Sequence, residues 1–199
     1  MFILGLNGSP QKEGNTVQLL NGALDAASQM GASTRLLHVV DALKGVKHPF
    51  CNNCSPVCEG ACARDNNLGE AYDILRKADG IIIGSPVYFG TVSAQLKAFW
   101  DKSRVLRKEK ALINVVGGAV TVGAGRFGGQ ETTVRAIHDI MLVHGLTVIG
   151  DGYFEDDAGH QGACAQKPSA NDKVGLTRAA IMGRRVAELA RATMELRRR

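Results

Sequence analysis

Short apolar segments alternate with segments of helical period along most of this sequence. The apolar segments cover residues 2–6, 35–40, 80–84, 111–116 and 146–149. They are largely continuous rather than alternating with polar residues, which is typical of strands buried on both faces. Such strands are buried when they form a parallel sheet that helices cover on both sides.

The segments between and after these runs carry apolar residues at intervals of three and four positions. This period is found over residues 20–30, 72–78, 92–106, 134–144 and 182–196, and it predicts amphipathic helices. Because strands and helices alternate along the chain, we predict an α/β fold. Its core is a doubly wound, five-stranded parallel sheet with helices on both faces.

Length and composition narrow the class of protein. The chain has 199 residues, which favours a single domain, and its 45% hydrophobic and 22% charged residues exclude a disordered chain. The net charge of +5 is not arranged as a basic stripe with interleaved aromatic residues, so we expect no nucleic-acid partner. No signal peptide and no membrane-spanning apolar run is recognisable. We therefore expect a cytoplasmic protein without a membrane partner.

Two long segments lack a regular pattern and interrupt the alternation of strands and helices. One is a cysteine-rich loop at about residues 41–69, and the other is an irregular segment at about residues 151–172. Loops of this length in a compact domain are usually functional or mobile.

The loop over residues 8–16 follows the first predicted strand and leads into the first predicted helix. Ser9, Gly14, Asn15 and Thr16 place hydroxyl groups, an amide and free backbone N–H groups at that helix N-terminus, where a phosphate is stabilised. The loop is neither a Walker A loop nor a GxGxxG dinucleotide loop. A structural alternative is that Ser9 and Asn15 are turn and capping residues.

Two further loops follow the third and fourth predicted strands at the same edge of the sheet. Tyr88 and Phe89 could form a flat wall for a ring system, although core packing is an equal alternative. The loop over residues 117–130 is rich in glycine, which lets the backbone approach a planar ligand closely. Its Arg126 could meet negative charge on that ligand, or could be a solvated surface residue. One ligand with a phosphate at one end and a polar aromatic ring at the other, FMN, fits all three loops.

The sequences GSPQKEGNT (8–16), SPVYFGTVSAQLKAFWD (85–101) and GAGRFGGQETT (123–133) resemble the NADPH-dependent FMN reductase group of the flavodoxin-like superfamily. Within that group the nearest relatives are the iron–sulfur flavoproteins, and the resemblance covers residues 2–150. It implies one flavodoxin-like, FMN-binding domain over residues 1–199. By this resemblance the phosphate lies against Ser9, Gly14, Asn15 and Thr16, and the ring is held by Pro86, Val87, Tyr88, Phe89, Gly90, Gly123, Gly125 and Arg126.

Four cysteines, Cys51, Cys54, Cys58 and Cys62, lie within twelve residues of the cysteine-rich loop. The ligands of a [4Fe–4S] cluster are often spaced this tightly, whereas structural zinc usually takes two well-separated pairs. Iron–sulfur flavoproteins carry a compact cysteine motif in the same loop, although this chain has three residues rather than two between the second and third cysteines. A cluster is the favoured interpretation, before uncoordinated or redox-paired thiols and before zinc. Cys164 stands apart and is expected to be a buried free thiol.

The resemblance implies an FMN-dependent oxidoreductase that accepts a hydride from NAD(P)H and passes electrons to a small acceptor such as a flavin or a quinone. No side-chain nucleophile or acid–base pair is required, because the flavin carries the chemistry. The alternative is an iron–sulfur flavoprotein electron carrier that exchanges electrons with ferredoxin or another protein. A flavin-binding regulatory protein without turnover is a third possibility. We also expect a homodimer or homotetramer, with the two long irregular segments as candidate contacts. His138 and His144 are expected to be packed, and His160 to lie in a solvated loop.

Overall fold

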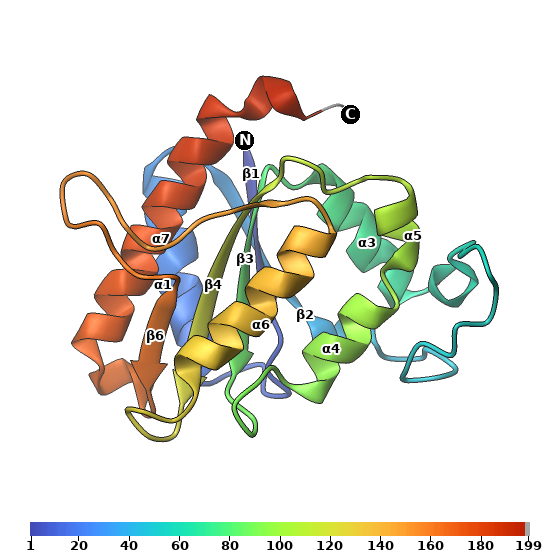
Figure 1. The fold of residues 1–199 in the computed structure, drawn as a ribbon, viewed down its shortest axis with the longest axis horizontal. Helices are drawn as coiled ribbons and strands as arrows, with labels where there is room; N and C mark the ends of the chain where they lie inside the picture. The colour runs from blue at the N-terminus through green and yellow to red at the C-terminus, as the bar shows by residue number, and fades with distance from the viewer. Residues whose placement is uncertain (198–199) are drawn as a thin grey trace.

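A computed structural model describes residues 1–197, so Arg198 and Arg199 of the terminal arginine run lie outside it. Figure 1 shows a twisted parallel sheet with helices on both of its faces. The strands are β1 Phe2–Asn7, β2 Ser33–His38, β3 Gly80–Pro86, β4 Val116–Gly123, β5 Thr147–Val148 and β6 Ala163–Gln166. The α-helices are α1 Asn15–Gln29, α2 Val39–Ala42, α3 Asn67–Lys77, α4 Ala94–Asp101, α5 Arg104–Lys108, α6 Gln130–Val143 and α7 Lys173–Ala192. Short 3-10 helices cover Ala61–Ala63, Ser169–Asn171 and Met194–Leu196.

The strand order is β2-β1-β3-β4-β5, and every strand pair is parallel. The sheet also has a sixth strand, because β6 pairs with β4 as well. β5 lies beside Val116 and Gly117, whereas β6 lies beside the stretch from Val120 to Gly123. The two short strands therefore occupy successive parts of one sheet edge. This order confirms the predicted doubly wound sheet, and β6 is an addition that corrects the irregular segment predicted over residues 151–172.

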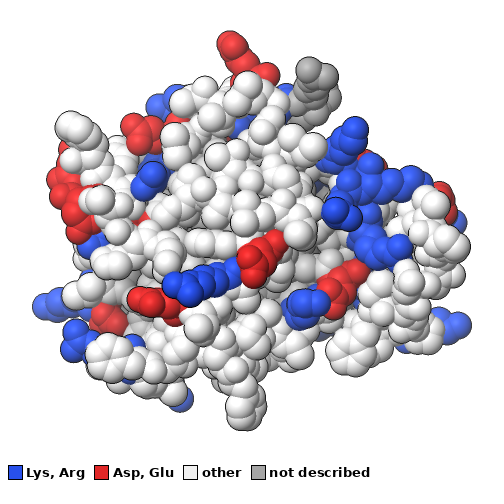
Figure 2. Space-filling model, viewed as in Figure 1, with Lys and Arg blue, Asp and Glu red and all other residues white. Residues whose placement is uncertain are grey.

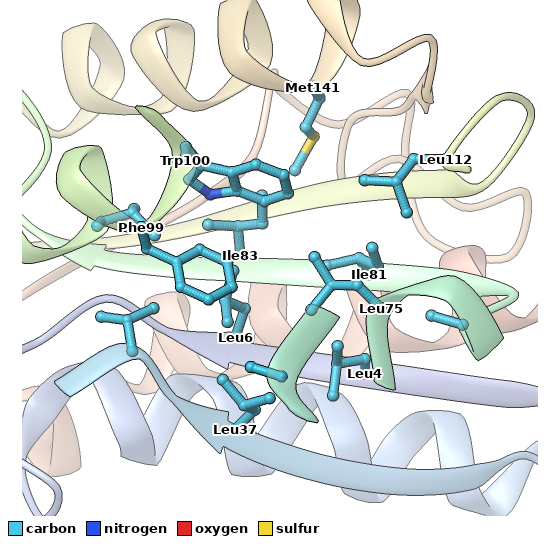
Figure 3. Packing of buried hydrophobic residues seen from close by; sticks show 14 of the residues in the cluster. Leu4, Leu6, Leu37, Leu75, Ile81, Ile83, Phe99, Trp100, Leu112 and Met141 are labelled. Carbon is cyan, nitrogen blue, oxygen red and sulfur yellow. The ribbon is translucent and has the colours of Figure 1, made fainter. Parts of the chain in front are cut away.

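The core has two layers because successive side chains of a strand point to opposite faces of the sheet. Leu4 and Leu6 of β1 pack toward α3, α4 and α6, whereas Ile3 packs toward α1 and α7. Figure 3 shows the first layer, in which Phe99 and Trp100 of α4 lie over the leucines and isoleucines of β1 and β3. Because both faces of the sheet are buried, its strands are continuous apolar runs, as the sequence predicts.

The fourth strand runs over Val116–Gly123 rather than over the predicted residues 111–116. Part of the predicted glycine-rich loop is therefore strand. A Cβ atom on Gly117 would lie 2.6 Å from Met141 Sδ, and one on Gly118 would lie 2.4 Å from Met182 Sδ. These two glycines let α6 and α7 pack closely on the sheet, and they are not available to a ligand.

The helix predicted over residues 92–106 is interrupted, since α4 ends at Asp101 and α5 begins at Arg104. The hydroxyl of Ser103, at this break, donates to the carbonyl oxygen of Trp100 at 2.6 Å. Bonding of a serine to a carbonyl of the preceding turn bends or ends a helix. No helix within residues 1–197 is long and apolar enough to cross a membrane.

Candidate functional site

The three loops singled out in the sequence meet at the carboxyl edge of the sheet. The backbone N–H of Gly8 donates to Gly84 O at 2.8 Å, and the Ser93 hydroxyl donates to Gly8 O, so the first two loops are joined. Thr132, in the first turn of α6, donates its hydroxyl to Gly90 O at 2.7 Å. This bond ties the second loop to the end of the third. The carboxyl edge beside the β1/β3 switch point is where doubly wound sheets bind ligands.

The N-terminus of α1 is open for an anion. Gly14 is its N-cap, no side chain caps the first turn, and the first turn holds no acidic residue. The first backbone N–H groups of a helix have no acceptor within the helix, and their dipoles favour an anion. Asn15, Thr16 and Val17 carry these groups here. The structure thus places Gly14, Asn15 and Thr16 together at this N-terminus.

The alternative of turn and capping roles applies to Ser9 but not to Asn15. Ser9 Oγ accepts the Gln11 N–H at 3.1 Å, which closes a turn. Asn15 does not cap α1, since its Oδ1 accepts the Ser169 N–H at 2.7 Å. Ser169 lies 154 positions away, so this contact could not be read from local sequence. It fixes the Asn15 side chain at the rim of the anion site.

The charges next to this loop are paired. Lys12 Nζ lies 2.8 Å from Asp41 Oδ2, and Lys44 Nζ lies 2.6 Å from Asp41 Oδ1. Hydrogen bonds from these two ammonium groups lower the pKa of Asp41 to about 2, and the bond from Lys12 has the larger effect. Asp41 is therefore ionised throughout the physiological pH range and holds the side chain of Lys12, which belongs to the loop.

The second loop forms a tight turn that exposes two aromatic rings. Tyr88 and Thr91 exchange two backbone hydrogen bonds, of 2.9 and 3.2 Å. The turn residues Phe89 and Gly90 have φ angles of 51° and 77°. The Phe89 side chain is fully exposed and Tyr88 is 45% exposed, which excludes the alternative of core packing. A bulky residue at positive φ is strained, and such strain is often found at functional sites.

The third loop is built around Gln130. Its amide donates to Gly125 O at 2.6 Å, and its Oε1 accepts the Gly128 N–H at 2.9 Å. Gly123 is buried at the end of β4 and leaves room for the Gln130 amide, because a Cβ atom there would lie 2.5 Å from Gln130 Nε2. Gly125 faces open space, with no atom within 4 Å of its Cβ position. Sequence reasoning missed Gln130, whose role depends on bonds that form only in the folded loop.

Two exposed side chains project from the same loop. Arg126 is exposed, and its guanidinium carbon lies 6.0 Å from the centre of the Phe127 ring. Phe127 itself is 98% exposed. Pro86 and Val87 lie at the base of the second loop, where the Val87 N–H donates to Val122 O at 2.9 Å. The carboxyl edge of the sheet thus combines an anion site, exposed rings and an exposed cation.

Three of the four clustered cysteines lie in an irregular loop packed against α4 and α5, and Cys62 lies in the 3-10 helix Ala61–Ala63 that follows it. Cys51, Cys58 and Cys62 are partly buried, and Cys54 is exposed. The loop is held by ties to α5, among them Lys108 Nζ, which lies 3.0 Å from Glu59 Oε1. Within residues 1–197, no group of three or more His, Cys, Asp or Glu side chains is gathered closely enough to hold a metal ion.

Lys102 is a buried cation beside these thiols. Its residue is only 2% exposed, and Nζ donates to the carbonyl oxygen of Phe50 at 3.0 Å. Burial raises the pKa of the Cys62 thiol, while the charge of Lys102 acts to lower it. An isolated buried ammonium is costly unless negative charge compensates it. Sequence reasoning missed Lys102, because its burial requires the cysteine loop to fold over the end of α4.

The histidines and Cys164 lie as follows. His144 is buried, with Nε2 2.9 Å from Ser103 Oγ, and burial lowers its pKa to about 4. Burial also lowers the pKa of His138, which is partly buried, whereas His160 is exposed. Cys164 is a partly buried free thiol in β6, and burial raises its pKa.

Comparison with known proteins gives matches along most of the chain. A sequence model of the family described as NADPH-dependent FMN reductase matches residues 1–161. An iron–sulfur flavoprotein of Methanocaldococcus jannaschii is 43% identical over 194 residues, covering 95% of this chain and 97% of that protein. An NAD(P)H dehydrogenase (quinone) of Chromohalobacter salexigens is 35% identical over 133 residues, covering 59% of this chain and 65% of that protein.

A solved structure shares the fold. The WrbA-like flavodoxin from Agrobacterium tumefaciens has a TM-score of 0.68 to this chain at 21% identity, covering 96% of this chain and 97% of that one. The likeness confirms the predicted flavodoxin-like arrangement of strands and helices.

Proposed function

This chain belongs to the NADPH-dependent FMN reductase family, as the sequence resemblance predicted, and is thus a flavoprotein oxidoreductase in kind. From that premise we propose that it binds FMN, accepts a hydride from NADPH or NADH, and passes electrons to a small acceptor such as a quinone or a free flavin. The observation that carries this proposal is the convergence of the three loops at one edge of the sheet. Bound FMN supplies the hydride-accepting ring, and the protein supplies binding and orientation.

The α1 N-terminus is the proposed phosphate site. Backbone N–H groups of the first turn, with Ser9, Asn15 and Thr16 around them, would hold the phosphate oxygens. The open N-terminus supports this assignment, since no side chain of the protein already occupies the cap. Ser169 holds Asn15 Oδ1, which leaves the Asn15 amide N–H groups free to donate to an anion.

The second and third loops are the proposed ring site. Pro86, Val87 and Gly90 would set the backbone of one wall, while Tyr88 and Phe89 would shape the face that admits substrate. Gly123 and Gly125 would let the other wall approach the ring. Arg126 would stabilise the negative charge that the reduced ring carries. The protein needs no catalytic acid or base in this mechanism, and we assign none.

Anaerobic mixing tests the hydride donor. The FMN-loaded protein is mixed with NADPH and, separately, with NADH, and flavin absorbance is followed. The proposal expects loss of the absorbance band with at least one donor, and its return when a quinone is added. If neither donor bleaches the flavin, the reductase proposal is wrong.

A second function, single-electron transfer through a cluster, is favoured by the cysteine loop. We propose that Cys51, Cys54, Cys58 and Cys62 hold a [4Fe–4S] cluster, which would exchange one electron at a time. The support comes from the residue type and from the spacing of four thiols within twelve residues, since the thiols are not gathered around one point in residues 1–197. The buried Lys102 would compensate a cluster that carries net negative charge. The name of the relative from Methanocaldococcus jannaschii also supports a cluster. Iron and sulfide analysis of anaerobically purified protein tests it, and fewer than about two iron atoms per chain would contradict a four-iron cluster.

The assembly proposed from the resemblance is a homodimer or homotetramer. A neighbouring copy would complete the substrate side of the exposed ring site. Light scattering of the FMN-loaded protein measures the mass directly, and the mass of a single chain would refute this part of the proposal.

A further inference from the structure

Asn7, the last residue of β1, has a fully buried amide that is bonded to the first loop, residues 8–16. Its Oδ1 accepts the Ser9 N–H at 3.0 Å, and its Nδ2 donates to the Gln11 carbonyl oxygen at 3.0 Å. The side chain of Gln11 in turn lies against Gly14, since a Cβ atom on Gly14 would lie 3.1 Å from Gln11 Oε1. Asn7 therefore connects the turn that begins the loop to the N-cap of α1, where the phosphate is proposed to bind.

The third partner of Asn7 is His38, which ends β2 and lies opposite Asn7 in the parallel strand pair. Asn7 Nδ2 lies 2.9 Å from His38 Nδ1. The two backbone bonds fix the orientation of the amide, because only its nitrogen can donate to Gln11 O and only its oxygen can accept the Ser9 N–H. Asn7 is therefore the donor to His38. An acceptor Nδ1 requires the neutral imidazole with its proton on Nε2, so this contact selects one charge state of His38.

The surroundings of His38 also favour the neutral ring. Partial burial lowers the pKa of His38, and of the charges that act on it, Asp41 of α2 raises the pKa and Lys12 of the first loop lowers it. Asp41 is itself paired with Lys12 and Lys44, so its negative charge is compensated. The other charged residues of the first loop, β2 and α1 are exposed and do not shift this pKa; they are Glu13, Arg35 and Asp25. His38 is therefore neutral at neutral pH and takes up a proton only below the ordinary histidine range.

We propose that neutral His38, acting through Asn7, positions the first loop for the phosphate of FMN, and that protonation of His38 releases this loop and weakens FMN binding. The inference rests on the proposed function, in which the phosphate binds at the N-terminus of α1. A proton on His38 Nδ1 would face an N–H group of Asn7, so either the ring or the amide must turn away. Turning the amide breaks its bonds to Ser9 and Gln11, and turning the ring leaves a buried N–H of Asn7 without an acceptor. Either movement removes a hydrogen bond that holds the loop.

Positive charge is not gathered where the phosphate is proposed to bind. Figure 2 shows Lys and Arg side chains clustered at the right of the molecule, over α5 and the neighbouring loops, and mostly uncharged side chains along the lower edge, where the loop after β3 protrudes (Figure 1). The cation of the first loop, Lys12, is already paired. A phosphate at the N-terminus of α1 would therefore depend on N–H groups that the loop holds in position, and a displaced loop should lower its affinity.

Two replacements of His38 that share one shape test the proposal. Asparagine places an acceptor oxygen where His38 has Nδ1 and does not titrate, whereas leucine has the shape of asparagine and no acceptor. Flavin fluorescence gives the dissociation constants of FMN and of riboflavin for the original protein, His38→Asn and His38→Leu, at pH values from about 8 to about 5. The FMN phosphate itself takes up a proton at about pH 6, so the three proteins are compared with one another at each pH. Riboflavin, which lacks the phosphate, reports whether the ring site is intact.

At the alkaline end of the range, His38→Asn should bind FMN within about twofold of the original protein, and His38→Leu about three- to tenfold more weakly. At the acidic end, the original protein should approach the affinity of His38→Leu, while His38→Asn should bind FMN about three- to tenfold more tightly than His38→Leu. Riboflavin should bind the three proteins similarly at each pH. A merely structural role of His38 would instead change the FMN affinity by a factor that does not depend on pH.

Parallel pH profiles of the original protein and His38→Asn would overturn the proposal and leave the proposed function intact. Tighter FMN binding by the original protein than by His38→Asn at the acidic end would also overturn it, because a protonated ring would then attract the phosphate. If the original protein binds no FMN at any pH, the proposed function fails and this inference fails with it. Should a His38 variant lose riboflavin binding, nuclear magnetic resonance of the original protein replaces it. FMN should then lower the pKa of His38, since a ligand that prefers the neutral ring stabilises it, and an unchanged or raised pKa would contradict the proposal.

Discussion

Lys102 Nζ donates a 3.0 Å hydrogen bond to the carbonyl oxygen of Phe50, the residue that precedes the first cysteine of the cluster. The ammonium group is almost completely buried, and no carboxylate lies within ion-pair distance of it in the described part of the chain. A buried cation of this kind is unfavourable alone and favourable beside thiolates. The hydrogen bond between Lys102 and Phe50 thus links the fold of the cysteine loop to the charge of the proposed [4Fe–4S] cluster.

Replacing Lys102 should therefore change two different quantities, the stability of the apo protein and the reduction potential of the bound cluster. In Lys102→Met the apo protein should be as stable as the original or more stable, because an apolar side chain replaces a buried charge. The cluster should become harder to reduce, with a midpoint potential lower by tens of millivolts, since a nearby positive charge is lost. Denaturant unfolding and potentiometry measure the two effects.

Lys102→Arg is the control, because it keeps the charge and should retain most of the potential. A strongly destabilised apo Lys102→Met with unchanged iron content and potential would assign Lys102 a purely structural role.

The open N-terminus of α1 leads to a second prediction. In Gly14→Asp a carboxylate would cap the helix in place of glycine, itself a tolerated N-cap, which should stabilise the apo protein by about 0.5 kcal/mol. The same carboxylate would stand where the phosphate is proposed to bind, so FMN binding should weaken at least about tenfold. Gly14→Asn caps the helix without charge and should weaken FMN binding less. Riboflavin, which lacks the phosphate, should bind all three proteins similarly. Equal FMN affinity in the Asp and Asn variants would place the phosphate elsewhere.

Phe89 leads to a third prediction, because its ring is fully exposed and its φ angle is 51°. Asparagine tolerates this backbone conformation better than phenylalanine. Phe89→Asn should therefore raise the free energy of unfolding by about 0.5–1 kcal/mol. The same change should lower kcat/KM for NADPH about three- to tenfold, since it removes a wall of the proposed ring site. Thermal unfolding and steady-state kinetics check both, and an unstable variant with full activity would contradict the assignment.

The buried His144 predicts a pH dependence of stability. Its pKa is lowered to about 4 by burial, whereas an unfolded histidine titrates near 6.5. Between these values the unfolded chain binds a proton that the folded protein does not, so stability falls as pH falls from about 6.5 to about 4. The contribution is up to about 3 kcal/mol. His144→Gln keeps a nitrogen near Ser103 and should flatten this part of the profile. Parallel profiles for the two proteins in this range would contradict the prediction.

The sequence predicts the fold well because its signals are local. The apolar runs of β1 and β3 and the helical period of α6 are each readable within a short window. β6 was missed, since Ala163–Gln166 is short and lacks branched side chains, and only pairing with β4 makes it a strand. Gly117 and Gly118 were assigned to a loop because glycine alone does not distinguish close packing from ligand approach.

The candidate site is only partly readable from sequence. Its three loops were found because loops after parallel strands share one edge. The contacts that hold them, such as Ser93 to Gly8 and Ser169 to Asn15, join residues 85 and 154 positions apart. They depend on the whole fold, and so does the burial of Lys102.

A titration of the apo protein with FMN and with riboflavin, followed by flavin fluorescence, tests the central claim most directly. Phosphate binding at the α1 N-terminus predicts that FMN binds at least about a hundredfold more tightly than riboflavin. Equal affinity for the two flavins, or no binding of either, would contradict the account.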